Sequence, residues 1–185
     1  MFDFEYLGYL TEAGGDGNHA VAVRMAKEDR AFTKLRHIWE DQVLQRKAKL
    51  KLFQSGVISV LIYSSEVWKL TDKLMGTLRG WAARKLARIT GKSVREEYHE
   101  PTFDLVKKLR VSRLRWVGHV LRKEETSYDR RALLTLKQPY PPGSALMDVA
   151  DKAIQELVNM ALDRDGWRVL VAMLNRKSYS IAVRV

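Results

Sequence analysis

Apolar residues recur every three or four positions along most of the chain, from Val21 to Leu174. This spacing collects apolar side chains on one face of an α-helix, where they can pack into a core. It predicts helices over residues 19–39, 46–63, 71–90, 102–109, 113–123, 149–161 and 164–174. Helix ends agree with these limits, because Thr71 begins the third helix, Gly91 can stop it and Asp163 can cap the last helix.

Two short stretches depart from the helical pattern. Apolar and polar residues alternate from Phe2 to Tyr6, which is typical of a β-strand. Prolines and a glycine between Lys137 and Ser144 cannot continue a helix and predict a linker. The sequence therefore predicts a mainly α fold, a helical bundle with a short N-terminal β stub and a C-terminal helical pair. The predicted parts are a stub at 1–17, a helical domain at 18–136, a Pro-rich linker at 137–144, a helical pair at 145–175 and a tail at 176–185.

Residue composition excludes several classes of site. The 185 residues include no cysteine, so a disulfide scaffold, a Cys-ligated zinc site, an iron–sulfur cluster and a thiol nucleophile are excluded. None of the four histidines pairs with a carboxylate at the helical spacing typical of metal ligands. The adjacent pairs at 96–97 and 124–125 place two glutamates on diverging sides of a helix, which favours solvated surface over an acid/base couple. We therefore expect no metal site, no cofactor and no catalytic residue.

The apolar pattern also bears on the cellular compartment. The longest apolar run, 56–63, is far shorter than the roughly 20 residues needed to cross a bilayer. Asp3 and Glu5 precede any basic residue, unlike the start of a secretory signal. We expect an intracellular protein, in the nucleus or the cytoplasm, with no membrane partner.

Positive charge is concentrated in two segments of the middle of the chain. The whole chain carries a net charge of +11. Residues 69–95 contain eight basic residues and one acidic residue, and residues 107–123 contain seven basic residues and no acidic one. Such clustering favours a polyanionic partner, although lysines and arginines on two solvated helix faces are the simpler interpretation.

Each basic segment also places tryptophan beside arginine. Arg115, His119 and Arg122 share one face of the predicted helix 113–123, while Leu114, Val117 and Leu121 share a core-facing side. Rows of basic residues beside an aromatic ring can bind phosphates while the ring stacks on a sugar or a base. The same pattern arises where a tryptophan covers the edge of a core and arginines extend around it. The candidate nucleic-acid-binding residues in the helices are Lys27, Arg30, Lys34, Trp81, Arg84, Arg88, Lys92, Arg113, Arg115, Trp116, His119 and Arg122.

Five short motifs, in order along residues 2–174, resemble the C-terminal part of non-LTR (LINE-type) retrotransposon reverse transcriptases. They are FEYLG at 4–8, a helix with Arg24, Ala31, Phe32, Leu35 and Trp39, VLIYSSEVW at 60–68, RLRWVGHVLR at 113–122 and DRDGWR at 163–168. The fourth motif is the most specific. Two positions depart from the family pattern, because Ser59 and Ser64 stand where that family often has Pro and Gly.

The resemblance implies a role in positioning a substrate. It implies that Tyr6, Leu7 and Gly8 lie in a primer-grip-like segment and that the following helices form a thumb. A thumb holds the template–primer duplex, of RNA or DNA, by its phosphates. The family's catalytic aspartates lie in a palm domain upstream of this segment, and the chain contains no aromatic–Asp–Asp motif. We therefore expect a reverse-transcriptase fragment, derived from an RNA-directed DNA polymerase, that has no catalytic activity alone and has a palm domain as its missing partner.

Two alternatives remain open from the sequence. Residues 102–109 and 113–123, separated by a break at 110–112, could form a helix-turn-helix that binds one preferred DNA sequence. The chain could instead be a helical protein-interaction domain, whose binding to nucleic acid would vanish at physiological salt.

Overall fold

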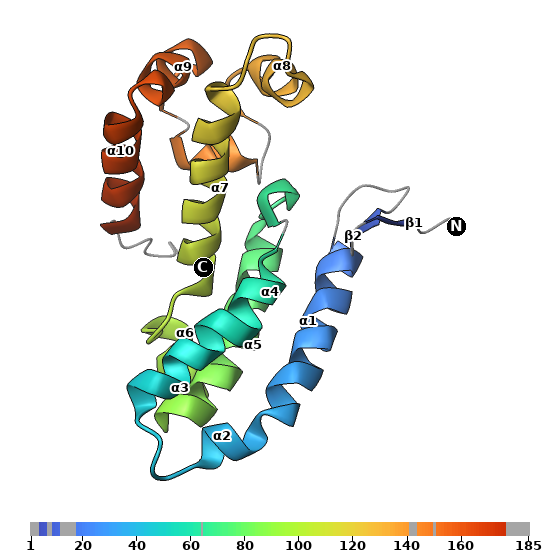
Figure 1. The fold of residues 1–185 in the computed structure, drawn as a ribbon, viewed down its shortest axis with the longest axis vertical. Helices are drawn as coiled ribbons and strands as arrows, with labels where there is room; N and C mark the ends of the chain where they lie inside the picture. The colour runs from blue at the N-terminus through green and yellow to red at the C-terminus, as the bar shows by residue number, and fades with distance from the viewer. Residues whose placement is uncertain are drawn as a thin grey trace, which may run out of the picture. The chain divides into compact units, whose positions relative to one another are not determined.

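The structure, a computed structural model, describes residues 4–6, 9–11, 18–63, 65–140, 144–149 and 151–176. It is mainly helical, as the apolar periodicity predicts (Figure 1). The chain divides into two compact units, residues 1–106 and 107–185. The division falls in the first turn of a helix and not at the Pro-rich segment 137–144, where the sequence analysis placed a linker.

The N-terminal segment contains two short strands. β1 (Phe4–Tyr6) and β2 (Tyr9–Thr11) pair in an antiparallel arrangement. Leu7 and Gly8 of the predicted primer-grip-like segment lie outside the described residues, and so does the side chain of Tyr6.

The first unit is built from a succession of helices. They are α1 (Asn18–Lys34), α2 (Arg36–Glu40), α3 (Arg46–Leu52), the π-helical η1 (Phe53–Ile58), α4 (Ser59–Leu61), the 3-10 helix η2 (Ser65–Val67), α5 (Asp72–Thr90) and α6 (Val94–His99). The predicted first helix is interrupted at Leu35, which separates α1 from α2. In the predicted helix 46–63, Val60 and Tyr63 are exposed, so this stretch buries one face only.

An aromatic cluster forms the centre of this core. The rings of Phe32 and Trp39 stack with centroids 4.9 Å apart, and Phe53 packs edge-on against Phe32 at 5.9 Å. Trp81 stacks on Phe53 from α5, with 6.4 Å between the ring centroids. These contacts hold α1, α2, η1 and α5 together. Other apolar residues at helical spacing on α1 and α5, such as Val21, Leu74 and Leu78, are also buried.

The ends of α5 are confirmed as predicted. The Thr71 hydroxyl accepts a hydrogen bond from the backbone N–H of Leu74 at 3.2 Å, which caps the helix. Gly91 ends it with a left-handed φ of 77°, a conformation that glycine adopts without strain.

The helix formed by residues 105–121 differs from its prediction. α7 (Leu105–Leu121) is one continuous helix, so the break expected at 110–112 is absent from it. Residues 109–114 contain no glycine or proline, and Leu109, Val111 and Leu114 are all buried, so nothing interrupts the helical hydrogen bonds at the expected break. The predicted helix-turn-helix therefore lacks its turn.

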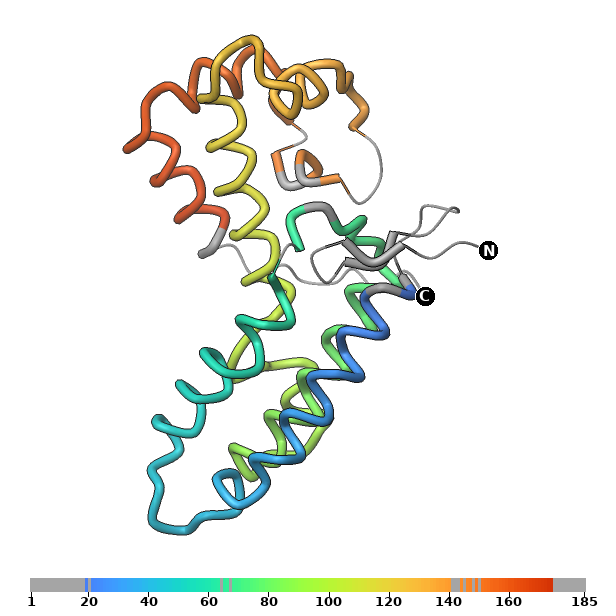
Figure 2. Tube along the Cα trace, turned by 45° about the vertical axis from the view of Figure 1, so that its right-hand side comes forward, coloured from blue at the N-terminus to red at the C-terminus, as the bar shows by residue number. Residues whose placement is uncertain are grey.

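The second unit packs around α7. Its other elements are α8 (Tyr128–Leu134), the 3-10 helix η3 (Ala145–Val149), α9 (Ile154–Leu162) and α10 (Arg164–Arg176). α10 lies alongside α7 in both views (Figures 1 and 2). Leu114, Val117 and Leu121 face the core, as predicted. Tyr140, from the Pro-rich segment, is buried in the same core and donates a hydrogen bond from its hydroxyl to the carbonyl of Lys152 at 2.8 Å. Residues 137–140 are thus part of this unit.

Candidate anion-binding site

A tryptophan and a glycine fix the contact between α7 and α10. The Trp167 side chain is 3% exposed, and its Nε1 donates to the carbonyl of Leu114 at 3.1 Å. The indole lies directly against Gly118, where a Cβ would be 2.6 Å from Trp167 Cδ1 and closer still to Nε1. The indole of Trp167 thus fills the space beside Gly118.

The start of α10 sets the direction of its arginines. Asp163 caps this helix, because its Oδ1 accepts from the backbone N–H of Asp165 at 3.1 Å and its carbonyl accepts from that of Trp167 at 2.9 Å. Arg164 and Arg168 then follow one turn apart on the helix, on either side of Trp167.

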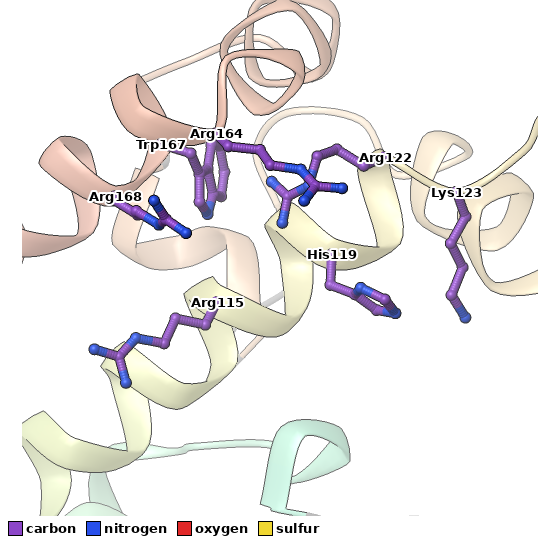
Figure 3. Close-up of a pocket in the computed structure, with 7 residues that line it drawn as sticks. All are labelled: Arg115, His119, Arg122, Lys123, Arg164, Trp167 and Arg168. Atoms are coloured by element: carbon purple, nitrogen blue, oxygen red, sulfur yellow. The ribbon is translucent and has the colours of Figure 1, made fainter.

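These contacts leave a basic hollow beside Trp167 (Figure 3). The hollow has a volume of about 390 Å³. Its lining residues, which define the name "basic hollow" below, are Arg115, His119, Arg122, Lys123, Arg164, Trp167 and Arg168. Five of these seven carry a positive charge, and among the described residues the lining includes no carboxylate.

Arg122 makes a hydrogen bond to α9 and lies near two other arginines. Its Nη1 donates to the carbonyl of Ala161 at the end of α9, at 3.1 Å. Burial lowers the pKa of the Arg122 guanidinium, and the nearby positive charges of Arg164 and Arg168 lower it further. The guanidinium remains charged, because arginine titrates far above neutral pH. Arg164 and Arg168 are thus close enough to Arg122 for their positive charges to disfavour its charged form.

Two of the lining cations have carboxylate partners. Arg168 Nη1 lies 2.7 Å from Asp165 Oδ1, in a pair that is largely exposed and therefore worth little. Lys123 pairs with Asp129 on α8. Within the described part of the chain, no ion pair joins Arg115, Arg122 or Arg164 to a carboxylate. The hollow thus keeps excess positive charge that an anion would neutralise.

The predicted nucleic-acid-binding residues of α7 divide into residues that line the basic hollow and residues that pack into the core. Arg115, His119 and Arg122 lie together on one face, as predicted, and all three line the basic hollow. Trp116 is half-buried and packs against the core of the second unit. Arg113 is 3% exposed, so its prediction as a surface nucleic-acid-binding residue is wrong. Position 113 lies four residues after Leu109 and four before Val117, which are both fully buried, so all three share one face of the continuous helix.

The predicted residues of the first unit form no comparable site among the described residues. Trp81 is 1% exposed and its Nε1 donates to Asp29 Oδ1 at 2.9 Å, so it belongs to the core and cannot stack on a base. Arg88 donates to Glu40 at 3.2 Å. The other candidates are exposed on α1, on α5 or just after it, namely Lys27, Arg30, Lys34, Arg84 and Lys92.

Sequence reasoning missed Arg164 and Arg168 as site residues. Their i, i+4 spacing within the DRDGWR motif is the signal that could have found them. Their proximity to Arg122 depends on the packing of Trp167 on Gly118, which joins the fourth and fifth motifs of the resemblance in one place.

The described residues include neither a metal-binding cluster nor a membrane-spanning helix. No group of three or more His, Asp or Glu side chains in them could hold a metal ion. In the same part of the chain, every helix is too short or too polar to span a bilayer. Comparison with protein-family models, curated proteins and solved structures finds no significant match.

Proposed function

We propose that the chain binds the phosphate backbone of an RNA or DNA duplex through the basic hollow, without a catalytic centre of its own. The observation that carries this proposal is the gathering of five cationic side chains, with no carboxylate among the described lining residues, where α7 packs on α10. Guanidinium groups suit phosphate well, because their planar N–H donors match two phosphate oxygens at once.

The burial of Trp167 favours phosphates over bases as the ligand. Its ring is buried and its N–H is already bonded to Leu114, so neither stacking nor donation to a base is available. Contacts limited to phosphate carry no base information. We therefore expect affinity without sequence preference.

The resemblance to reverse transcriptases supports the same role. The two motifs that line the basic hollow, at 113–122 and 163–168, are among the five that resemble the C-terminal part of those enzymes. On this proposal the chain positions a template–primer duplex, while a palm domain in another polypeptide or segment supplies the polymerase chemistry.

A salt titration of the full chain tests the proposal. Arg115→Ala combined with Arg164→Ala removes two exposed cations of the hollow that have no carboxylate partner among the described residues. The double variant should bind two unrelated duplexes more weakly by a similar factor. Its plot of log affinity against log salt should flatten by about 2 units, since each phosphate contact contributes roughly 0.9.

A matched control removes the same charge elsewhere in the second unit. Arg131, on α8, and Lys137 are both exposed and outside the basic hollow, so Arg131→Ala with Lys137→Ala should leave the slope nearly unchanged. Equal effects of the two double variants would refute the assignment of binding to the hollow. A loss confined to one duplex sequence would favour base-specific recognition instead.

A protein-interaction domain is the second candidate function. Leu162, Val169 and Met173 on α9 and α10 are 65%, 52% and 57% exposed, and exposed apolar side chains of this size are typical of binding surfaces. On this alternative, affinity for duplex would disappear at physiological salt, and the Arg115→Ala/Arg164→Ala variant would bind as the parent chain does.

A further inference from the structure

Three of the cations in the basic hollow converge on one region. Figure 3 shows the side chains of Arg122 and Arg164 extending toward each other beside Trp167, with Arg168 reaching from the next turn of α10. Arg115 extends in another direction in the same view. We call Arg122, Arg164 and Arg168 the arginine cluster.

The cluster is held together against its own charge. Arg122 donates a hydrogen bond to the carbonyl of Ala161, and the packing of Trp167 on Gly118 positions the part of α10 from which Arg164 and Arg168 extend. Burial is the main cause that lowers the pKa of Arg122, and the positive charges of Arg164 and Arg168 lower it further. Asp165 compensates Arg168 only in part, because both side chains of that pair are largely in solvent. An anion with more than one negative charge would therefore be favoured over one with a single charge.

We propose that the arginine cluster binds the terminal phosphate at an end of a nucleic-acid strand in preference to an internal phosphodiester. This inference rests on the proposed function. A terminal phosphate carries about −1.5 to −2 charges at neutral pH and presents three oxygens to donors, whereas an internal phosphodiester carries a single charge and two such oxygens. Three convergent guanidinium groups match the terminal group better in both respects.

The size and lining of the hollow agree with this ligand. Its volume of about 390 Å³ is at the lower end of the range for small-ligand sites, roughly 300–1,000 Å³. The buried Trp167 offers no ring for a base, so the charged end of the strand is the part that the hollow can hold. Arg115, which lies apart from the cluster, is placed to contact a neighbouring phosphodiester.

Fluorescence anisotropy with the full chain tests the proposal. Two blunt duplexes of identical sequence, one with 5′-phosphates and one with 5′-hydroxyls, are compared at the same salt, together with a 3′-phosphorylated form. We expect at least one phosphorylated end to bind about tenfold more tightly than the hydroxyl end, the effect of one or two additional charge-assisted hydrogen bonds. Arg164→Ala combined with Arg168→Ala should reduce this preference to within about twofold.

Control variants separate the cluster from general attraction. Arg115→Ala should weaken binding to all duplexes equally and preserve the preference for phosphorylated ends. Arg131→Ala, on the exposed face of α8, should change neither. A circular dichroism spectrum identical to that of the parent chain confirms that each variant is folded.

The outcomes distinguish this inference from the proposed function. Equal affinity of the parent chain for phosphorylated and hydroxyl ends would overturn the terminal-phosphate assignment and leave backbone binding in place. No binding to any duplex at low salt would overturn the proposed function itself. Inorganic phosphate is a second possible ligand of the arginine cluster. If it displaced the duplex at an equal concentration of phosphate groups, the assignment to a strand end would also be overturned.

Discussion

Gly118→Ala tests the contact that builds the basic hollow. The added methyl group would overlap the indole of Trp167, at 2.6 Å from Cδ1 and less from Nε1. The indole is buried on its other sides, so it cannot move away without disturbing the core of the second unit. The substitution also threatens the hydrogen bond from Trp167 to the carbonyl of Leu114.

The expected loss of stability follows from three terms. Overpacking of a well-packed core costs about 1–3 kcal/mol. Loss of the Trp167–Leu114 hydrogen bond costs about 1 kcal/mol more. Alanine is preferred over glycine inside a helix by about 0.8–1 kcal/mol, which offsets part of the cost. We therefore expect Gly118→Ala to reduce the free energy of unfolding by about 2 kcal/mol.

Urea denaturation measures this change, followed by far-UV circular dichroism and by tryptophan fluorescence. Gly56→Ala is the matched control, because no atom lies within 4 Å of the Cβ it would add, and it should be neutral or stabilising by up to about 1 kcal/mol. Displacement of Trp167 also moves Arg164 and Arg168, so Gly118→Ala should weaken duplex binding. If Gly118→Ala were as stable as the parent chain, the packing of α10 on α7 described above would be wrong.

Two further predictions concern the capping of α6 and the pH dependence of the second unit. In the capping box of α6, the Ser93 hydroxyl accepts from the N–H of Glu96 at 3.2 Å, and the Glu96 carboxylate accepts from the N–H of Ser93 at 2.8 Å. Ser93→Ala removes this capping box and should lower the free energy of unfolding, measured by urea titration, by about 1 kcal/mol. Unchanged stability of the variant would contradict this prediction. Hydrogen bonds, first from Lys123 and then from Ser127, lower the pKa of Asp129 from 3.8 to about 2. A carboxyl group whose pKa is lowered in the folded state stabilises the fold at pH values above its ordinary pKa. Asp129→Asn should therefore be less stable than the parent at neutral pH. Thermal unfolding should show this difference in stability closing from about pH 4 to about pH 2. A difference that stays constant down to pH 2 would show that ionisation of Asp129 is not its source.

The helical fold could be predicted because its determinants are local. The helix α5 is an example, since Thr71, Gly91 and the apolar residues between them specify its start, its end and its buried face without reference to other segments. The interruption at Leu35 and the continuity of α7 through residues 110–112 could not be predicted this way. Both features depend on how these side chains pack against the rest of the core. The apolar periodicity of a single sequence contains no information on that packing.

The candidate site was predictable only in part. The shared face of Arg115, His119 and Arg122 follows from helix geometry alone. The contribution of Arg164 and Arg168 depends on the long-range contact between Trp167 and Gly118, about 50 positions apart in the chain, which no local pattern contains. The burial of Trp81 and Arg113 has the same origin, because aromatic and basic residues at helical spacing occur both at surfaces and at core edges.

The central claim is that a nucleic-acid duplex binds at the basic hollow, and an NMR titration tests it most directly. The Nε–Hε resonances of the arginine side chains are followed while a short duplex is added to the full chain. The structure predicts the largest changes at Arg122, Arg164 and Arg168, a smaller one at Arg115, and none at Arg131 on α8. Changes of equal size at Arg131, or changes that leave the arginine cluster unaffected, would contradict binding at this site.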